Sequence, residues 1–151
     1  MDAHAIAEQA RIEHEILKHI TNALQVSLAW DTGGAGFTRK LSSVRFVTQS
    51  LQRHLDRQLA LEECDGYMSV VLETHPDWSD RIDWLKREHD EIRSSINRIV
   101  ANLESLSHLD ESAFDEACDD IRNLLDQLAE HGKKEGELLE EAFLQEEVGL
   151  D

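Results

Sequence analysis

The sequence is poor in the residues that interrupt helices. It contains one proline, and its seven glycines lie mostly in two clusters. Proline cannot donate a backbone hydrogen bond and glycine loosens the chain, so long stretches without either residue favour helices over sheets. At 151 residues, the chain is long enough to bury one core and short for two. We therefore expect residues 1–151 to form a single all-α domain.

Positive charge is also scarce. Lys and Arg together number 15 against 32 Asp and Glu, which gives a net charge of −17. A surface of this sign repels the phosphate backbone of nucleic acids and the anionic surface of membranes. We therefore expect neither nucleic acid nor a membrane as a partner.

Long apolar runs are absent. The N-terminal stretch "MDAHAIAEQARIEHEIL" has no basic segment followed by an apolar core, and no window reaches the roughly 20 apolar residues of a membrane span. We expect a cytoplasmic protein. Cys64 and Cys118 lie on different predicted helices without zinc-finger spacing, so buried reduced thiols are favoured over a disulfide.

Three breaks divide the chain: "WDTGGAGFT" at 30–38, "THPDWSD" at 74–80 and "SHLDES" at 107–112. Between them, apolar residues recur at alternating intervals of three and four, which keeps one face of each helix turned towards its neighbours. Short connections between amphipathic helices predict an up-down-up-down antiparallel four-helix bundle. The expected helices span about 4–30, 39–73, 79–107 and 111–145.

Several polar residues occupy positions on these apolar faces. Burial of a polar side chain costs free energy unless the side chain finds a partner, so each of them requires an explanation. These residues are His14, Gln58, Glu62, His89, His131 and Glu135.

Four of these residues lie at a similar depth in the predicted bundle. His14 and His89 follow the starts of their helices by about ten residues, and Glu62 and Glu135 precede the ends of theirs by a similar number. In an antiparallel bundle, these starts and ends lie at the same side. The four residues are therefore expected in one layer, with His131 one turn deeper on the face of Glu135.

The chemistry of this layer allows two interpretations. Three imidazoles and two carboxylates form a ligand set suited to iron, manganese or zinc, whose borderline acidity matches nitrogen and oxygen donors. Each histidine could instead be an ordinary core residue with a hydrogen-bond partner. Their coincidence in depth with the two carboxylates favours a metal site, whose predicted ligands are His14, Glu62, His89, His131 and Glu135.

Three stretches at these positions resemble the hemerythrin-like (HHE cation-binding) family: "QLALEECDGYM" at 58–68, "LKREHDEI" at 85–92 and "LAEHGKKEGELLEEAF" at 128–143. Members of this family are four-helix bundles that hold non-haem iron, and the resemblance extends over nearly the whole chain. It implies one or two iron ions, with zinc or manganese as alternatives. The ligand roles that it implies fall on the five residues named above, with Glu62 and Glu135 as the bridging carboxylates.

Two positions depart from the pattern of this family. Gln58 stands four residues before Glu62, where a histidine is expected, and Arg93 stands four residues after His89, where many members have a second histidine. An amide oxygen is a weak ligand, and a protonated guanidinium group cannot bind a metal. His54, one turn before Gln58, is the local candidate to replace the missing ligand.

Arg93 also supports a rival hypothesis in which the chain holds no metal. Its guanidinium group, together with Lys18 one turn after His14, could pair with the two buried glutamates and neutralise the layer. The protein would then be a metal-free, degenerate bundle that acts as a protein-interaction module.

We regard a metal-binding protein as the first hypothesis. Such a protein would hold iron and bind dioxygen, nitric oxide or a peroxide at an open coordination position, in a sensing or storage role. Because two ligand positions are changed, we expect a binding protein rather than an enzyme, and either a monomer or a homodimer.

Overall fold

The computed structural model describes residues 3–31, 36–64 and 66–149. Every regular element within these ranges is a helix, and no strand occurs among them. The expected all-α fold is therefore confirmed. Over the same ranges the elements are α1 (Ala3–Ala29), α2 (Phe37–Cys64), α3 (Tyr67–Thr74), the 3₁₀ turn η2 (Pro76–Trp78), α4 (Ser79–Ser105) and α5 (Glu111–Gly149).

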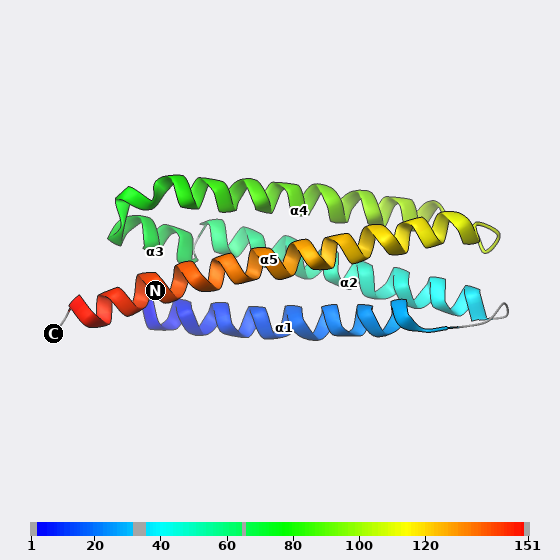
Figure 1. Ribbon diagram of the computed structural model, residues 1–151, viewed down its shortest axis with the longest axis horizontal. Coiled ribbons are helices and arrows are strands. Elements are labelled where there is room, and N and C mark those ends of the chain that lie inside the picture. Colours follow the sequence, from blue (N-terminus) through cyan, green and yellow to red (C-terminus); the bar gives the residue numbers. More distant parts are fainter. Residues whose placement is uncertain (1–2, 32–35, 65, 150–151) are drawn as a thin grey trace.

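The long helices α1, α2, α4 and α5 alternate in direction along one axis (Figure 1). The starts of α1 and α4 lie at the same side of the molecule as α3 and the end of α5. Each long helix packs against the next one in the chain, and α1 also touches α5 to close the bundle. This is the up-down-up-down arrangement that the short connections predict.

The second predicted helix, 39–73, is interrupted, and in this respect the prediction was wrong. The helix α2 ends at Cys64 and α3 begins at Tyr67, with Gly66 immediately before it. A Cβ atom on Gly66 would lie 2.6 Å from the backbone oxygen of Leu61 and 2.8 Å from the Cα atom of Glu62. Only glycine permits this close approach of the chain to the end of α2.

The other helix boundaries agree with the sequence patterns to within about one turn. The predicted glycine-rich break at 30–38 includes residues 32–35, which lie outside the described residues. Both cysteines are free thiols, and Cys118 is buried as expected, whereas Cys64 is exposed. None of the described helices combines the length and the apolar character that a bilayer crossing requires.

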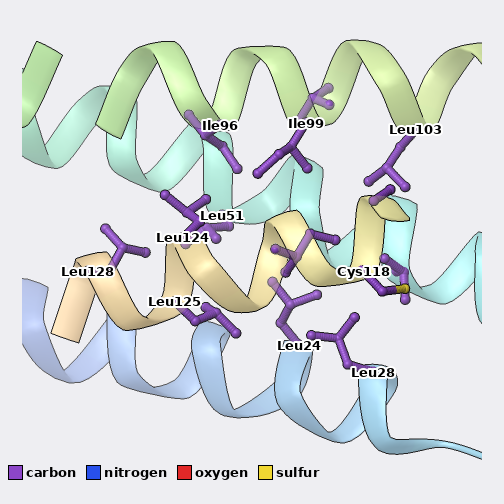
Figure 2. Packing of buried hydrophobic residues seen from close by; sticks show 14 of the residues in the cluster. Leu24, Leu28, Leu51, Ile96, Ile99, Leu103, Cys118, Leu124, Leu125 and Leu128 are labelled. Carbon is purple, nitrogen blue, oxygen red and sulfur yellow. The ribbon is translucent and has the colours of Figure 1, made fainter. Parts of the chain in front are cut away.

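Two apolar clusters fill the interior. The larger one occupies the half of the bundle opposite α3 and includes Leu51, Ile96 and Leu124 (Figure 2). The smaller one lies beside α3 and includes Tyr67 and Met68. Among the residues whose side chains the structure describes, the buried polar ones are Thr48, His54, Gln58, Glu62, His89, His131 and Glu135.

A side chain from α2 binds the end of α4 beside the larger apolar cluster. The Arg45 Nε group donates to the carbonyl oxygen of Leu103 at 2.7 Å, and its guanidinium group also donates to that of Leu106. The last carbonyl groups of a helix have no partner within the helix, and a basic side chain can satisfy them. This contact joins α2 to α4 at the side away from α3.

Candidate metal centre

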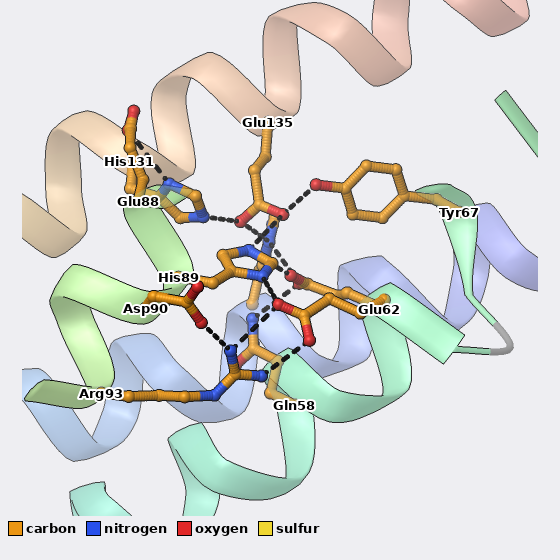
Figure 3. Close-up of polar contacts among 11 residues, drawn as sticks. Gln58, Glu62, Tyr67, Glu88, His89, Asp90, Arg93, His131 and Glu135 are labelled. Atoms are coloured by element: carbon orange, nitrogen blue, oxygen red, sulfur yellow. Dashed lines mark hydrogen bonds and ion pairs between the residues drawn. The ribbon is translucent and has the colours of Figure 1, made fainter. Parts of the chain in front are cut away.

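Four buried side chains converge in the interior of the bundle. Glu62 comes from the last turn of α2, His89 from α4, and His131 and Glu135 from successive turns of α5 (Figure 3). All four belong to the predicted ligand set, and their exposed fractions run from 0% for His89 to 7% for Glu62. One potential ligand atom from each residue lies within 4.8 Å of those of the other three.

The closest contacts join imidazole nitrogens to carboxylate oxygens. His131 Nε2 lies 3.0 Å from Glu135 Oε1, and His89 Nε2 lies 3.2 Å from Glu62 Oε2. A longer distance of 3.8 Å separates His89 Nε2 from Glu135 Oε2. Two donors bound to one ion at about 2.0–2.2 Å lie roughly 3–4 Å apart, so these distances are compatible with a shared ion.

His14, the fifth predicted ligand, borders this cluster from α1. Its Nε2 atom lies 4.0 Å from both Glu62 Oε1 and Glu135 Oε1, and its side chain is 31% exposed. The depth argument from the sequence therefore places all five residues correctly near one another. His14 is more loosely packed than the other four and stands at the solvent side.

Several polar atoms of the cluster have no hydrogen-bond partner. They include Glu62 Oε2, His89 Nε2 and His131 Nε2, all of them buried. Buried polar groups in native proteins are nearly always satisfied, and a binding site for an ion is one recognised reason for exceptions. Because these orphaned atoms face one another, the residues present fit a cation, which they would hold at their centre.

Each buried imidazole is oriented by a further carboxylate. His89 Nδ1 lies 2.9 Å from Glu63 Oε1, and His131 Nδ1 lies 3.4 Å from Glu88 Oε2. A carboxylate at Nδ1 favours the proton on that nitrogen, so Nε2 is the nitrogen that would offer its lone pair to a cation after losing its own proton. Outer carboxylates of this kind accompany histidine ligands in many metal sites.

Basic residues in turn hold these outer carboxylates. Arg93 forms two parallel hydrogen bonds to Glu63, at 3.0 and 2.9 Å, and Lys134 Nζ lies 2.9 Å from Glu88 Oε1. The pKa of each of these glutamates is lowered, because the bonds to the basic residue and to the histidine outweigh burial, which acts to raise it. Both carboxylates are therefore charged acceptors at neutral pH.

This geometry corrects the expected role of Arg93. Its partners are Glu63 and Asp90, not Glu62 or Glu135. Lys18 is exposed, and the structure assigns it no ion pair with either buried glutamate over the described residues. The pairing of basic residues with the buried glutamates, on which the metal-free hypothesis rested, is absent from the described part of the chain.

Gln58 and His54 also lie differently from the sequence expectations. Gln58 Nε2 donates to Glu62 Oε1 at 3.1 Å, while its own Oε1 atom has no partner. His54 faces α1, where its Nε2 atom lies 3.7 Å from Glu13 Oε2. The side chain of Gln58 therefore orients Glu62, and His54 lies beside Glu13, outside the group of four converging ligands.

The ionisation of the cluster follows from its burial and its close charges. Burial and the charge of Glu135 raise the pKa of Glu62 to about 7. Burial acts to lower the pKa of His89, but the close carboxylates of Glu135 and Glu62 outweigh it and raise this pKa to about 10. Glu135 has a lowered pKa, because the close imidazoles of His131 and His89 overcome the effect of burial, which acts to raise it. The chain without an ion therefore keeps protons where a cation would otherwise lie.

Sequence reasoning missed one buried residue of the site. The hydroxyl group of Tyr67 donates a hydrogen bond to Glu135 Oε2 (Figure 3). Gly66 was the available signal, because an isolated glycine inside a helical pattern often marks a local break. A break at this point changes the direction in which Tyr67 faces.

Comparison with known families gives one result. The model of the hemerythrin HHE cation-binding domain matches residues 5–143, nearly the whole chain. The chain belongs to this family. No curated protein and no solved structure gives a significant match, so the family model carries this assignment.

The family assignment agrees with the site geometry. A cation-binding family matches a chain in which imidazoles and carboxylates from different helices converge in the core. This hemerythrin-family chain departs from the expected ligand pattern at Gln58, which donates to Glu62, and at Arg93, which pairs with Glu63 and Asp90. The established conclusion is a hemerythrin-like bundle with a ligand cluster able to hold a metal.

Proposed function

We propose that this hemerythrin-family protein binds one iron ion through Glu62, His89, His131 and Glu135. The observation that carries the proposal is the convergence of buried donor atoms, three of which have no hydrogen-bond partner. His14 supplies a fifth ligand from the more exposed side after a small movement of its side chain.

The donor types favour iron within a short list of metals. Two imidazoles with carboxylates and open positions are the usual surroundings of non-haem ferrous iron. Zinc accepts the same donors in a tetrahedral arrangement, and manganese accepts them at lower affinity, so both are competitors. Iron is our choice because it accepts more than four ligands, and His14, 31% exposed and 4.0 Å from both glutamates, borders the four buried donors.

A single ion is favoured over a pair. A second ion would need further ligands near His14, where Gln58 presents its amide group to Glu62. Arg93 adds none, because both ends of its guanidinium group are bonded to Glu63. The two departures from the family pattern thus fall on the ligands that a dinuclear site would require.

The open position supports reversible binding of a small molecule. Bound ferrous iron supplies an electron-rich centre for a ligand such as dioxygen or nitric oxide, and a peroxide is the larger alternative. The chain orients its imidazoles through Glu63 and Glu88 and excludes bulk water with its two apolar clusters. We propose a sensing or storage role in the cytoplasm rather than turnover of a substrate.

Elemental analysis tests this proposal directly. Protein purified without a histidine tag is loaded anaerobically with ferrous iron, desalted and measured for metal, with an optical spectrum recorded alongside. We expect about one iron per chain. His89→Ala and His131→Ala should abolish retention, whereas His108→Ala, at an exposed loop position, should not change it.

Other results would contradict the proposal in different ways. Two irons per chain with an oxo-bridge charge-transfer band would replace the single ion with the dinuclear centre. A chain that cannot retain iron, zinc or manganese after loading would refute cation binding. Loss of retention in His108→Ala as well would show that the histidine substitutions act through folding.

A further inference from the structure

Tyr67 makes a buried contact to the candidate site that its ligand pattern does not require. It is the single tyrosine of the sequence, and only 1% of its surface is exposed. Its hydroxyl group donates to Glu135 Oε2, on the side of the carboxylate away from His131 (Figure 3). Because water does not reach this bond, the phenol group remains a fixed partner of the carboxylate.

The break between α2 and α3 brings the phenol group to this position. In an uninterrupted helix, Tyr67 would follow Glu62 by five residues and point about 140° away from it around the axis. The close approach at Gly66 starts a new helix instead and lets Tyr67 face the same cluster as Glu62. The break therefore has a consequence for the site as well as for the fold.

The geometry points to Tyr67 as a positioning residue that makes Glu135 bind the cation through Oε1 alone. This inference rests on the proposed function of the same site. Glu135 Oε1 lies 3.0 Å from His131 Nε2, among the other donors, whereas Oε2 accepts the hydrogen bond from the phenol group and lies 3.8 Å from His89 Nε2. Glu135 Oε1 therefore faces the proposed cation position, whereas Oε2 is occupied by the hydrogen bond from Tyr67.

One-oxygen binding has a chemical consequence. A glutamate that binds through both oxygens occupies two coordination positions, whereas one that binds through a single oxygen leaves a position for an external ligand. Tyr67 thereby keeps the coordination number low. The phenol proton is engaged by Glu135 Oε2, so Tyr67 acts on the site as a hydrogen-bond donor to this carboxylate.

Tyr67→Phe removes the hydroxyl group and keeps the ring that packs in the smaller apolar cluster. We would titrate the metal-free chain and this variant with Co²⁺, whose visible bands are intense at low coordination number and weak at six. We expect the variant to bind Co²⁺ about tenfold more weakly, because outer hydrogen bonds commonly contribute ten- to hundredfold to metal affinity. We also expect weaker bands, because the released Oε2 atom can then join the coordination sphere.

A matched control separates this effect from the general loss of a buried hydroxyl group. Thr48 is fully buried on α2, and its Oγ1 atom has no hydrogen-bond partner. Thr48→Val should leave both the Co²⁺ affinity and the band intensity unchanged. Circular dichroism of the metal-free variants confirms that each one is folded before titration.

Two outcomes would overturn the inference. Equal affinity and equal bands in the parent chain and Tyr67→Phe would show that Tyr67 does not position Glu135. A visible phenolate-to-iron band in the ferric parent chain, lost in Tyr67→Phe, would make Tyr67 a direct ligand. A parent chain that binds no Co²⁺, zinc or iron would instead refute the proposed function itself.

Discussion

The half of the bundle around Ile96 and the half around Glu135 are built on the same long helices but have different interiors. The first is filled by aliphatic side chains (Figure 2), and the second contains a layer of carboxylates and imidazoles (Figure 3). Burial of aliphatic groups stabilises the fold whatever else is bound. Burial of the polar layer is costly unless its charges and donor atoms are satisfied.

This difference assigns separate tasks to the two halves. The aliphatic half supports the positions of the helices, and the polar half uses those positions to bring four donors together. The smaller cluster beyond the polar layer, with Met68 and Ile82, closes the other side and limits access of water. Substitutions in the two halves should therefore affect stability and cation binding independently.

The largest expected effect is on stability, in the aliphatic half. Ile96 is fully buried, and Ile96→Ala should lower the free energy of unfolding by about 2–5 kcal/mol, because it removes packed methyl groups and leaves a cavity. Urea unfolding in the presence of a chelator, which keeps the chain metal-free, measures this loss of stability. Metal stoichiometry at a temperature where the variant is folded should stay unchanged, and reduced stoichiometry would contradict the independence of the halves.

Binding of an ion in the polar half should have a smaller effect on stability. An ion that binds only the native state adds about 2.7 kcal/mol of stability when its free concentration is 100 times Kd. The melting temperature of the parent chain should rise on loading with ferrous iron under anaerobic conditions. His131→Ala should remove this rise, while Ile96→Ala should retain it from a lower starting point. An equal rise in His131→Ala would place the ion elsewhere.

The sequence predicted which residues form the polar layer because depth along a helix follows from residue counting. The helix periodicity assigned His14, His89 and Glu135 to similar heights, and the structure places them around one centre. Counting fails where a helix is interrupted. The break at Gly66 reorients Tyr67, and no spacing rule within a continuous helix could have placed its hydroxyl group on Glu135.

Long charged side chains were the other source of error. Arg93 follows His89 by one turn, which made the buried carboxylates its apparent partners. The structure pairs it with Glu63, because that glutamate lies towards the half-buried edge of α2 and a guanidinium group can reach it without being desolvated. Periodicity correctly placed Glu62 on the inward face of α2, but it does not tell which of two adjacent glutamates a long guanidinium side chain on α4 will reach.

The outer carboxylates offer a finer test of the polar half. Glu63→Gln replaces an acceptor of the His89 Nδ1 proton with a weaker one and also breaks the paired bonds to Arg93. We expect cation affinity to fall roughly tenfold, about 1.4 kcal/mol, with little change in the stability of the chelated chain. Competition with a chromogenic chelator measures the affinity. Glu116→Gln, at an exposed position of α5, is the matched control, and an equal loss there would indicate a general charge effect.

The smallest expected effect concerns two glycines on α5 that flank the polar layer. A Cβ atom added to Gly132 or Gly136 would meet no atom within 4 Å, so neither glycine is required by packing. Alanine loses less backbone entropy in a helix, and Gly136→Ala should raise the free energy of unfolding by about 0.5–1 kcal/mol. Urea unfolding of the chain in the presence of a chelator measures this gain, and Gly132→Ala should give a similar one.

The same variant also tests the cation site. Because Gly136 follows Glu135 directly, unchanged cation affinity in Gly136→Ala would show that the position of this ligand does not depend on a flexible backbone. A loss of affinity despite higher stability would show that helix flexibility beside Glu135 is part of the site, and the division of tasks between the two halves would then need to include the backbone of α5.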